Sequence, residues 1–501
     1  MSQSVHPALR RIPTGIAGLD RILGGGVFTG GAYIVMGLPG AGKTTLGNQV
    51  AFRHVAEGGR ALYVTLLSET HARMLQHLQT FRFFDAAVIG RGLTYVSAFH
   101  VLETEGLKGI LGLLTREVRE ERITLLVIDG LVTAEQAAAS DTEVKKFVHE
   151  VQTLMSLTGC TAILLTNVSD RSSYPTHTMV DGIVELRDDL FGARAVRTLT
   201  VLKFRGGEQL RGRHVFDITN DGLVVHPRIE SLPAPPLKPQ TRALARTGIR
   251  QLDAMLGGGV DESSSTLVLG PPGSGKTLLG LHYLDAGAKA GEPGLHFGFS
   301  ESGSDLIAAA GAIGLDLASH VERGVLELDG VLSPEAGLDS LADQLLAAVH
   351  RRGVRRLFLD GLGDFRAVAV DPDRVGPMFS ALLVQLRALG VTTLISDDAN
   401  EVLTAEIVPP TPQVAARVQN IVLLRYVELR AQLHRLVSII KRRGAGYDRT
   451  IREFHIDGKG ITVADTFTSA EAVLGGLAHV LPNGAPKRRP TKKPRGRGKR
   501  T

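Results

Sequence analysis

The sequence predicts an α/β protein with two tandem domains, each a mainly parallel sheet flanked by helices and extended by a β-hairpin. Three observations favour this fold. The chain repeats itself, a Gly-rich loop stands between an apolar run and a helix in each copy, and short apolar runs alternate with amphipathic stretches. Such alternation is typical of a parallel sheet covered by helices on both faces.

The internal repeat is long and regular. TGIAGLDRILGGG (Thr14–Gly26) recurs as TGIRQLDAMLGGG (Thr247–Gly259), and later VLKFRGG (201–207) recurs as IIKRRGA (439–445). We interpret the repeat as a tandem duplication. It predicts a first domain at 1–231, a Pro-rich linker at 232–243, a second domain at 244–475 and a disordered basic tail at 476–501.

Composition and charge bound the class of protein. Of 501 residues, 43% are apolar and 22% charged, and the net charge of +6 belongs to the tail, since 487–501 contains nine basic residues and no acidic one. The single cysteine, Cys160, excludes a disulfide framework, and we expect it to be an inert residue of a buried strand. No segment resembles a signal peptide or is long enough to span a bilayer, so we expect a cytoplasmic protein.

The elements of the first copy follow from apolar periodicity. The predicted strands are Ala32–Met36, Ala61–Leu67, Leu125–Asp129 and Ala162–Asn167, and the predicted helices are Thr45–Ala56, Thr70–Thr80 and Thr142–Thr158. Later β-rich segments are predicted to form hairpins that extend the sheet: Gly182–Leu186, Val196–Phe204, His214–Thr219 and Leu223–His226. The second copy repeats the pattern around its loop, with a strand at Thr266–Leu269 and a helix at Leu278–Ala286.

The Gly-rich loop fits the phosphate-loop pattern G-x-x-x-x-G-K-[ST] in both copies. Glycines let backbone N–H groups turn toward a phosphate, the lysine reaches the β and γ oxygens, the threonine ligates Mg²⁺, and the next helix adds its dipole. We therefore predict two Mg-ATP sites in which Lys43 and Lys276 also assist catalysis. The loop residues are Gly37, Leu38, Pro39, Gly40, Ala41, Gly42, Lys43, Thr44 and Thr45, and Gly270, Pro271, Pro272, Gly273, Ser274, Gly275, Lys276, Thr277 and Leu278.

A second metal-side group is expected in each copy beside the loop threonines Thr44 and Thr277. Asp129 and Asp360 each close an apolar strand, as the aspartate that orients Mg²⁺ does in phosphate-loop ATPases. The alternative is an ordinary Asp-Gly turn. With the loops present, we favour the Mg²⁺ role.

Hydrolysis also needs a group that orients or deprotonates water. Glu69 and Glu301, each preceded by a serine after the next strand, are the candidate bases. The alternative is helix capping, in which Ser68 or Ser300 is the N-cap and an early glutamate interacts with the dipole. Asn167 and Asp397, near the end of the following strand, are candidate γ-phosphate sensors.

A Lys-x-Arg pair recurs along a predicted strand in both copies, as Lys203 and Arg205 and as Lys441 and Arg443. The two side chains of each pair face one way. They are either a solvated strand face or a finger that reaches a phosphate across a subunit interface. In other nucleotidases such a finger contributes roughly 10³–10⁵ in rate.

Together these motifs resemble the KaiC family of RecA-like tandem ATPases, the bacterial circadian-clock ATPases. The resemblance covers about 12–470 and is most specific at 197–223 and 420–461. It implies a ring-shaped hexamer, ATP held between subunits, and regulatory protein partners. It also implies nucleotide contacts across the interface from Lys203, Arg205, Gly207, Gln209, Thr219, Arg435, Lys441 and Arg443, with Arg197 equivalent to Arg435.

The chain departs from the family pattern in two places. The family usually has two adjacent glutamates after the strand, and Ser68 and Ser300 replace the first of them. Its autophosphorylated Ser-Thr pair falls on Ala415 and Ala416, which have no acceptor hydroxyl. We therefore predict slow hydrolysis and no KaiC-type autokinase cycle.

The preferred hypothesis is an Mg-ATP-binding, slowly hydrolysing ATPase that forms a nucleotide-dependent ring and acts in signalling through partner proteins. The alternatives are a protein kinase with another acceptor, a nucleotide-binding scaffold without turnover, and a RecA-like ATPase acting on single-stranded nucleic acid. The basic tail would bind nucleic acid by counterion release. It lacks interleaved aromatic residues, so this partner is less favoured, and no membrane partner is expected.

Overall fold

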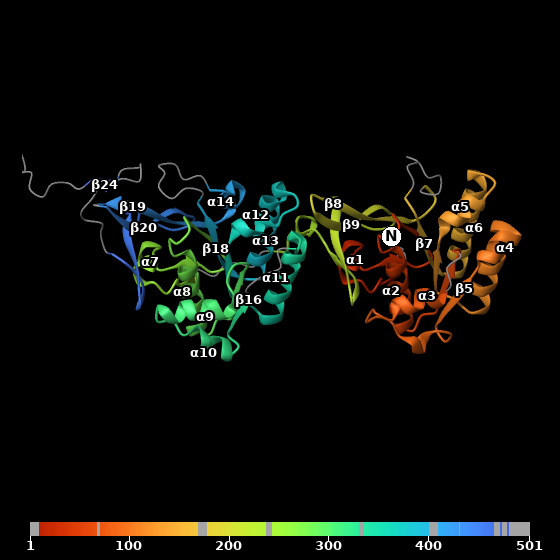
Figure 1. Ribbon diagram of the computed structural model, residues 1–501, viewed down its shortest axis with the longest axis horizontal. Helices are drawn as coiled ribbons and strands as arrows, with labels where there is room; N and C mark the ends of the chain where they lie inside the picture. The colour runs from red at the N-terminus through yellow and green to blue at the C-terminus, as the bar shows by residue number, and fades with distance from the viewer. Residues whose placement is uncertain are drawn as a thin grey trace, which may run out of the picture. The chain divides into compact units, whose positions relative to one another are not determined.

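The computed structural model describes residues 10–67, 71–168, 178–236, 243–329, 335–399, 409–429, 431–464, 471–472 and 478–479. The predictions for Ser68, for Glu69, for half of the linker and for nearly all of the tail lie outside these residues. The chain divides into two compact units, the first made of 1–234, 335–347 and 368–372 and the second of the remainder. Each unit contains a nine-stranded, mainly parallel sheet with flanking helices (Figure 1), which confirms the predicted fold class.

The first sheet has the strand order β11-β10-β9-β8-β3-β7-β6-β4-β5. The strands from β8 to β5 pair in parallel, and β9, β10 and β11 continue the sheet as antiparallel hairpins. The bounds are β3 (Ala32–Gly37), β4 (Ala61–Thr65), β5 (Leu93–Ser97), β6 (Leu125–Asp129), β7 (Thr161–Thr166), β8 (Gly182–Phe191), β9 (Arg194–Phe204), β10 (Arg213–Thr219) and β11 (Gly222–His226). A small ribbon of β1 (Arg11–Ile12) and β2 (Val27–Phe28) precedes β3.

Helices cover both faces of this sheet because successive side chains of a strand point to opposite sides. In β3, Tyr33 and Val35 pack in the cluster that contains α2, whereas Ile34 and Met36 pack in the cluster that contains α4 and α6. The buried Cys160 belongs to the second cluster, as expected, and burial raises the pKa of its thiol to about 12. The helices are α1 (Ala17–Ile22), α2 (Lys43–Ala56), α3 (His71–Leu78), α4 (Phe99–Glu120), α5 (Leu131–Ala137) and α6 (Asp141–Thr158).

The second sheet has the order β16-β15-β17-β18-β14-β19-β20-β21-β22 and repeats the first. Its strands are β14 (Ser265–Gly270), β15 (Gly294–Gly298), β16 (Leu326–Asp329), β17 (Arg356–Asp360), β18 (Thr392–Asp398), β19 (Asn420–Leu429), β20 (Gln432–Arg442), β21 (Arg452–Asp457) and β22 (Gly460–Val463). Two short ribbons pair β12 (Leu244–Ala245) with β13 (Val260–Asp261) and β23 (Glu471–Ala472) with β24 (Ala478–His479).

Helices α8, α9 and α10 pack on one face of the second sheet, and their leucines share a cluster with Val268, Phe358 and Leu394. The aromatic rings of Phe365 in α12 and Phe379 in α13 meet at 5.1 Å. The helices are α7 (Arg250–Met255), α8 (Lys276–Lys289), α9 (Gly303–Ala312), α10 (Leu317–Glu322), α11 (Leu338–Arg352), α12 (Leu362–Ala367), α13 (Val375–Ala388) and α14 (Pro412–Arg417). In the part of the chain that the structure describes, no helix is long and apolar enough to cross a membrane.

The predicted elements agree with the observed ones within a few residues at most ends. The largest difference is the first long hairpin, where β8 runs on to Phe191 although the apolar pattern stops at Leu186. Its outer half is mostly exposed and is stabilised by pairing with β9, so burial leaves no periodic signal there.

Candidate nucleotide-binding sites

The phosphate loop of the first unit is a tight turn that opens a helix. Gly40 and Gly42 have φ angles of 84° and 97°, the left-handed region that favours glycine, and α2 begins at Lys43. The Lys43 ammonium donates to the carbonyl oxygens of Gly37, at 2.7 Å, and Leu38, at 3.0 Å. Burial lowers the pKa of this lysine. The sequence motif therefore has the geometry that cradles a phosphate at a helix N-terminus.

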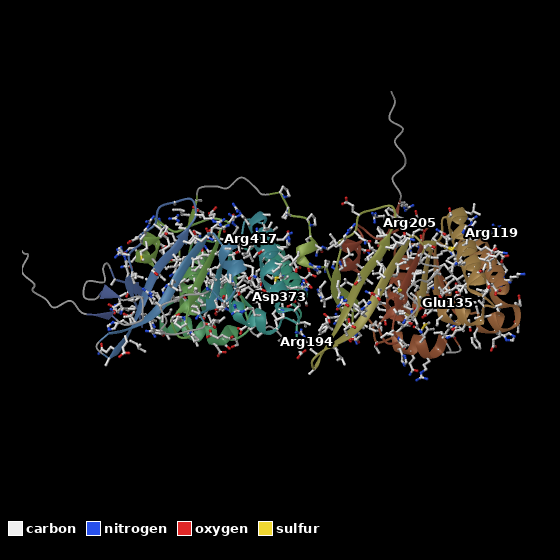
Figure 2. The ribbon with its side chains drawn as sticks, turned by 90° about the horizontal axis from the view of Figure 1, so that it is seen from above. Arg119, Glu135, Arg194, Arg205, Asp373 and Arg417 are labelled. Atoms are coloured by element: carbon white, nitrogen blue, oxygen red, sulfur yellow. The ribbon has the colours of Figure 1, made fainter. Side chains whose placement is uncertain are left out.

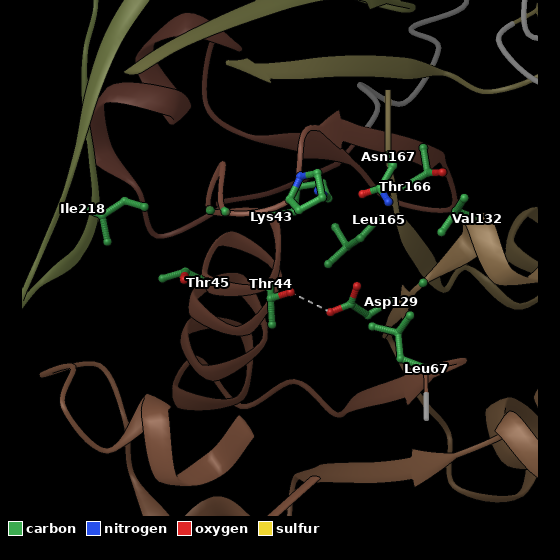
Figure 3. A pocket seen from close by; sticks show the side chains of 14 residues that line it. Lys43, Thr44, Thr45, Leu67, Asp129, Val132, Leu165, Thr166, Asn167 and Ile218 are labelled. Atoms are coloured by element: carbon green, nitrogen blue, oxygen red, sulfur yellow. Dashed lines mark hydrogen bonds between the residues drawn. The ribbon is translucent and has the colours of Figure 1, made fainter. Parts of the chain in front are cut away.

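The loop threonine and the strand-ending aspartate meet in this unit. Thr44 Oγ1 donates to Asp129 Oδ2 at 2.9 Å (Figure 3), and Tyr63 from the adjacent strand β4 donates to the same oxygen at 2.9 Å. Burial raises the pKa of Asp129, although the hydrogen bonds from Tyr63 and Thr44 act in the opposite direction. Sequence reasoning missed Tyr63, since a buried tyrosine in a strand usually indicates core packing alone.

A cavity of about 380 Å³ lies over the first loop. Lys43, Thr44 and Asp129 line it together with Thr166 and Asn167 from the end of β7 (Figure 3). The hydroxyl oxygen of Thr166 is buried and has no hydrogen-bond partner among the described residues. A buried polar atom without a partner costs stability, so its presence beside the loop points to a polar ligand.

The second loop repeats the first with one additional contact. Gly273 and Gly275 have φ angles of 75° and 102°, and Lys276 donates to the carbonyl oxygens of Gly270, at 2.9 Å, and Pro271, at 3.0 Å. The additional contact is an ion pair of 2.6 Å between Lys276 Nζ and Asp398 Oδ1. No sequence motif singled out Asp398.

Asp360 occupies the place of Asp129 but has different partners. Ser396 donates to Asp360 Oδ1 at 2.5 Å, Thr277 also hydrogen-bonds the carboxyl group, and His296 Nε2 lies 3.7 Å from Oδ2. Burial alone would raise the pKa of Asp360, but the contacts with His296, Ser396 and Thr277 outweigh it and lower the pKa. His296 stands on β15 where Tyr63 stands on β4, two residues before the partner of the aspartate.

Glu301 lies close enough to Asp360 for their charges to interact. Its Oε2 atom is buried and without a hydrogen-bond partner in the described part of the chain. Burial, and then the charge of Asp360, raise the pKa of Glu301. The capping alternative is wrong in this copy, because Ser302 caps α9 in a capping box with Asp305, whereas Ser300 donates to Asp364 at 3.1 Å. Glu301 therefore lies outside the cap of α9.

The sheet register corrects one predicted equivalence. Met36 pairs with Thr166 in the first unit, and its counterpart Leu269 pairs with Asp397 in the second. Asn167 therefore corresponds to Asp398 and not to Asp397, which is 1% exposed and forms an ion pair with Arg366 at 3.3 Å. Counting from the glycines that follow the preceding helices, at 159 and 390, would have given this register.

The two candidate bases also differ in register. Thr65 pairs with Asp129 and Gly298 pairs with Asp360. Along the sequence Glu69 is the fourth residue after Thr65, whereas Glu301 is the third after Gly298. The chain therefore has one additional residue before Glu69.

The two side chains of each Lys-x-Arg pair share one backbone carbonyl as acceptor, and Lys441 also donates to Ala415 O at 3.0 Å. Lys203 and Arg205 both donate to Thr178 O at 3.0 Å. Lys441 and Arg443 donate to Ala416 O at 3.1 and 3.2 Å. Figure 2 shows Arg205 and Arg194 at opposite ends of β9, so the first pair lies at the end of the long hairpin away from its tip.

The other predicted contact residues lie on or beside the same hairpins. Gln209 donates to Val201 O at 3.1 Å, and Gly207 packs against Arg11 and Phe28. Thr219 follows Ile218, which lines the cavity of its own unit. The buried Nε atoms of Arg197 and Arg435 have no hydrogen-bond partner among the described residues, although Arg197 faces Asp188 at 3.3 Å and Arg435 lies over the ring of Tyr426.

Comparison with known families identifies the family of the chain. The family model described as "ATPase: KaiC" matches residues 12–230 and 245–467, which together make up most of the chain. The chain belongs to the KaiC family of ATPases. It contains two tandem KaiC domains, and the resemblance inferred from the motifs is confirmed.

The chain is similar over nearly its whole length to proteins named circadian clock oscillator protein KaiC. It is 26% identical to the protein of Rippkaea orientalis over 489 residues, which cover 95% of this chain and 92% of the relative. It is 26% identical to that of Picosynechococcus over 484 residues, covering 93% and 92%. It is 24% identical to that of Synechococcus elongatus over 488 residues, covering 95% and 93%.

The residues of each site fit Mg-ATP. Mg²⁺ is usually bound by one or two protein oxygens, substrate phosphates and water, and not by a cage of side chains. The hydrogen-bonded pairs Thr44–Asp129 and Thr277–Asp360 offer such a set. The described residues contain no cluster of three or more His, Cys, Asp or Glu side chains that could hold a metal ion.

Proposed function

We propose that the protein is an Mg²⁺-dependent ATPase that hydrolyses ATP slowly at its two phosphate loops. The observation that carries this proposal is the hydrogen bond from the loop threonine to the strand-ending aspartate, present in both units. When bound, Mg²⁺ would neutralise charge on the β and γ phosphates. Thr44, Asp129, Thr277 and Asp360 would hold the ion, and Lys43 and Lys276 would bind the phosphates.

In the second unit, Glu301 is the candidate for the group that activates the attacking water. Glu301 would accept a proton from the attacking water through its unpartnered oxygen. Glu69 would act likewise in the first unit. Neither glutamate is preceded by a second one, since Ser68 and Ser300 stand there, so we expect low turnover.

We further propose a nucleotide-dependent ring, a hexamer, in which one subunit completes the site of its neighbour. The Lys-x-Arg pairs, with Gly207, Gln209, Thr219 and Arg435, would contact the neighbour's nucleotide. The ring would act through regulatory protein partners in the cytoplasm, as suggested by the relatives named as clock oscillator proteins. Autokinase activity is not proposed, because Ala415 and Ala416 offer only backbone groups.

The test is ATP turnover and molar mass of the purified full chain in ATP and in ADP. We expect turnover that decreases with Glu69→Gln and Glu301→Gln and is lost with Lys43→Ala plus Lys276→Ala. Mixing subunits tests the shared site. Thr277→Ala inactivates the second loop, and Arg443→Ala removes the arginine proposed to contact the neighbour's nucleotide. A ring that mixes the two variants should recover second-site turnover where an intact loop of one subunit meets an intact arginine of its neighbour. A protein that binds ATP, forms rings and hydrolyses nothing would be a nucleotide-gated scaffold and would contradict the proposal.

A further inference from the structure

The two phosphate loops differ in what already contacts their lysine. Among the described residues, the ammonium group of Lys43 is hydrogen-bonded only to the loop carbonyls of Gly37 and Leu38. The ammonium group of Lys276 makes the two equivalent bonds and also pairs with the carboxylate of Asp398 at 2.6 Å. The residue in the place of Asp398 in the first unit is Asn167, which is neutral and lines the cavity.

The geometry of β18 explains why this carboxylate faces the loop. Asp398 pairs with Gly270, the first loop residue. Successive side chains of a strand point to opposite faces, so Asp397 and Asp398 diverge. Asp397 is buried against Arg366, whereas the side chain of Asp398 is 55% exposed and meets Lys276, which is 10% exposed. Asp398 is thus placed by the sheet and not by a flexible loop.

The carboxylate of Asp398 competes with a bound phosphate for the ammonium group of Lys276. The loop lysine reaches the β and γ oxygens of a bound nucleotide, while the loop N–H groups hold the β-phosphate. To contact Lys276, a γ-phosphate must therefore displace the carboxylate of Asp398. The negative charges of the phosphate and the carboxylate would then repel each other. A diphosphate still engages the loop N–H groups and lacks the γ-phosphate that is repelled. In the first unit, the amide of Asn167 neither pairs with the lysine nor repels the phosphate.

We propose that Asp398 is a specificity-determining residue that weakens binding of nucleoside triphosphate, relative to diphosphate, at the second loop. This inference rests on the proposed function, because it assumes that both loops bind nucleotides. It makes the two sites unequal: compared with the first site, the second binds triphosphate less well relative to diphosphate. The difference originates in one residue, Asp398 against Asn167.

The experiment measures the affinities of fluorescent ADP and of a non-hydrolysable ATP analogue for the full chain in Mg²⁺. Lys43→Ala isolates the second site and Lys276→Ala isolates the first. We expect a lower ratio of analogue to ADP affinity at the second site. Asp398→Asn should raise the affinity of the second site for the analogue about tenfold and change its ADP affinity little. A factor of about ten lies between the effects expected for two like charges about 4 Å apart in water and near a protein surface. Asn167→Asp should lower analogue affinity at the first site.

Both substitutions are nearly isosteric, and ADP binding checks that each variant is folded. If Asp398→Asn leaves the ratio unchanged while both nucleotides bind, the inference is wrong and the proposed function stands. If Asp398→Asn weakens the analogue, Asp398 supports the metal and does not discriminate, which also overturns the inference. If the wild-type chain binds neither nucleotide at either loop, the proposed function fails and this inference fails with it.

Discussion

The hydroxyl of Thr44 donates a hydrogen bond to the carboxylate of Asp129, two residues that are 85 positions apart in the sequence. The strands that place them, β3 and β6, are not neighbours, because β7 lies between them. The parallel order of the sheet brings the loop after β3 and the end of β6 to one edge, which is the usual position of a ligand site in open α/β sheets. This pair underlies the first prediction.

Thr44→Ala should abolish the Mg²⁺ dependence of nucleotide binding at the first loop, whereas Thr44→Ser should retain it. Alanine removes the hydroxyl that binds the metal and donates to Asp129, and serine keeps both functions. ATP affinity measured with and without EDTA in a Lys276→Ala background is the test. Equal Mg²⁺ dependence in the alanine variant and the wild type would refute the metal role of Thr44.

Tyr63→Phe should reduce both stability and Mg²⁺-dependent nucleotide affinity. It removes a buried donor from Asp129, and a hydrogen bond to a charged group contributes about 1.5–3 kcal/mol. Tyr95→Phe is the matched control, because Tyr95 donates to Asn48 at 2.8 Å and not to Asp129. Urea unfolding should show a lower free energy of unfolding in both variants. Nucleotide affinity should fall only in Tyr63→Phe, and an equal fall in both would show that Tyr63 acts through general packing.

Because of Glu301, ATP turnover at the second site should fall at a pH above the ordinary pKa range of a glutamate. Its pKa is raised from 4.5, chiefly by burial, and a general base must be ionised to accept a proton. Turnover by the Lys43→Ala protein should therefore decrease, as the pH falls, at a higher pH than an ordinary carboxylate would give. Glu301→Gln should remove most of this turnover at every pH. A residual rate close to that of the parent would exclude Glu301 as the base.

Asp397 should make the stability of the second unit depend on pH. Burial, partly offset by Arg366, raises its pKa from 3.8 to about 6. The folded state then holds the proton more tightly than the unfolded chain, so the contribution of Asp397 is most favourable at low pH and is lost as the pH rises through about 6. Asp397→Asn keeps an oxygen for Arg366 and removes the titration.

Relative to Asp397→Asn, the wild type should lose about 2–3 kcal/mol of unfolding free energy between pH 4 and 7. This loss corresponds to a rise of about two units in the pKa of Asp397 on folding. The measurement is the difference in urea unfolding between the two proteins at several pH values. A difference that stays constant across this range would show that Asp397 titrates normally.

The sequence alone determined the tandem α/β architecture, the two phosphate loops and the aspartates that close their strands. These features have local signals: the alternation of apolar runs, glycines at left-handed positions such as Gly42, and an acid directly after a buried strand. Such signals depend on a few neighbouring residues, and their repetition along the chain makes each of them specific.

The differences between the two sites became visible only in the folded chain. Asp129 is supported by Tyr63 and Asp360 by His296 and Ser396, and Asp398, rather than Asp397, contacts the second loop lysine. Each of these contacts depends on strand register, which is fixed by packing between segments far apart in the sequence. A shift of one residue turns a side chain to the opposite face, so the adjacent pair Asp397 and Asp398 could not by itself indicate which carboxylate meets the loop.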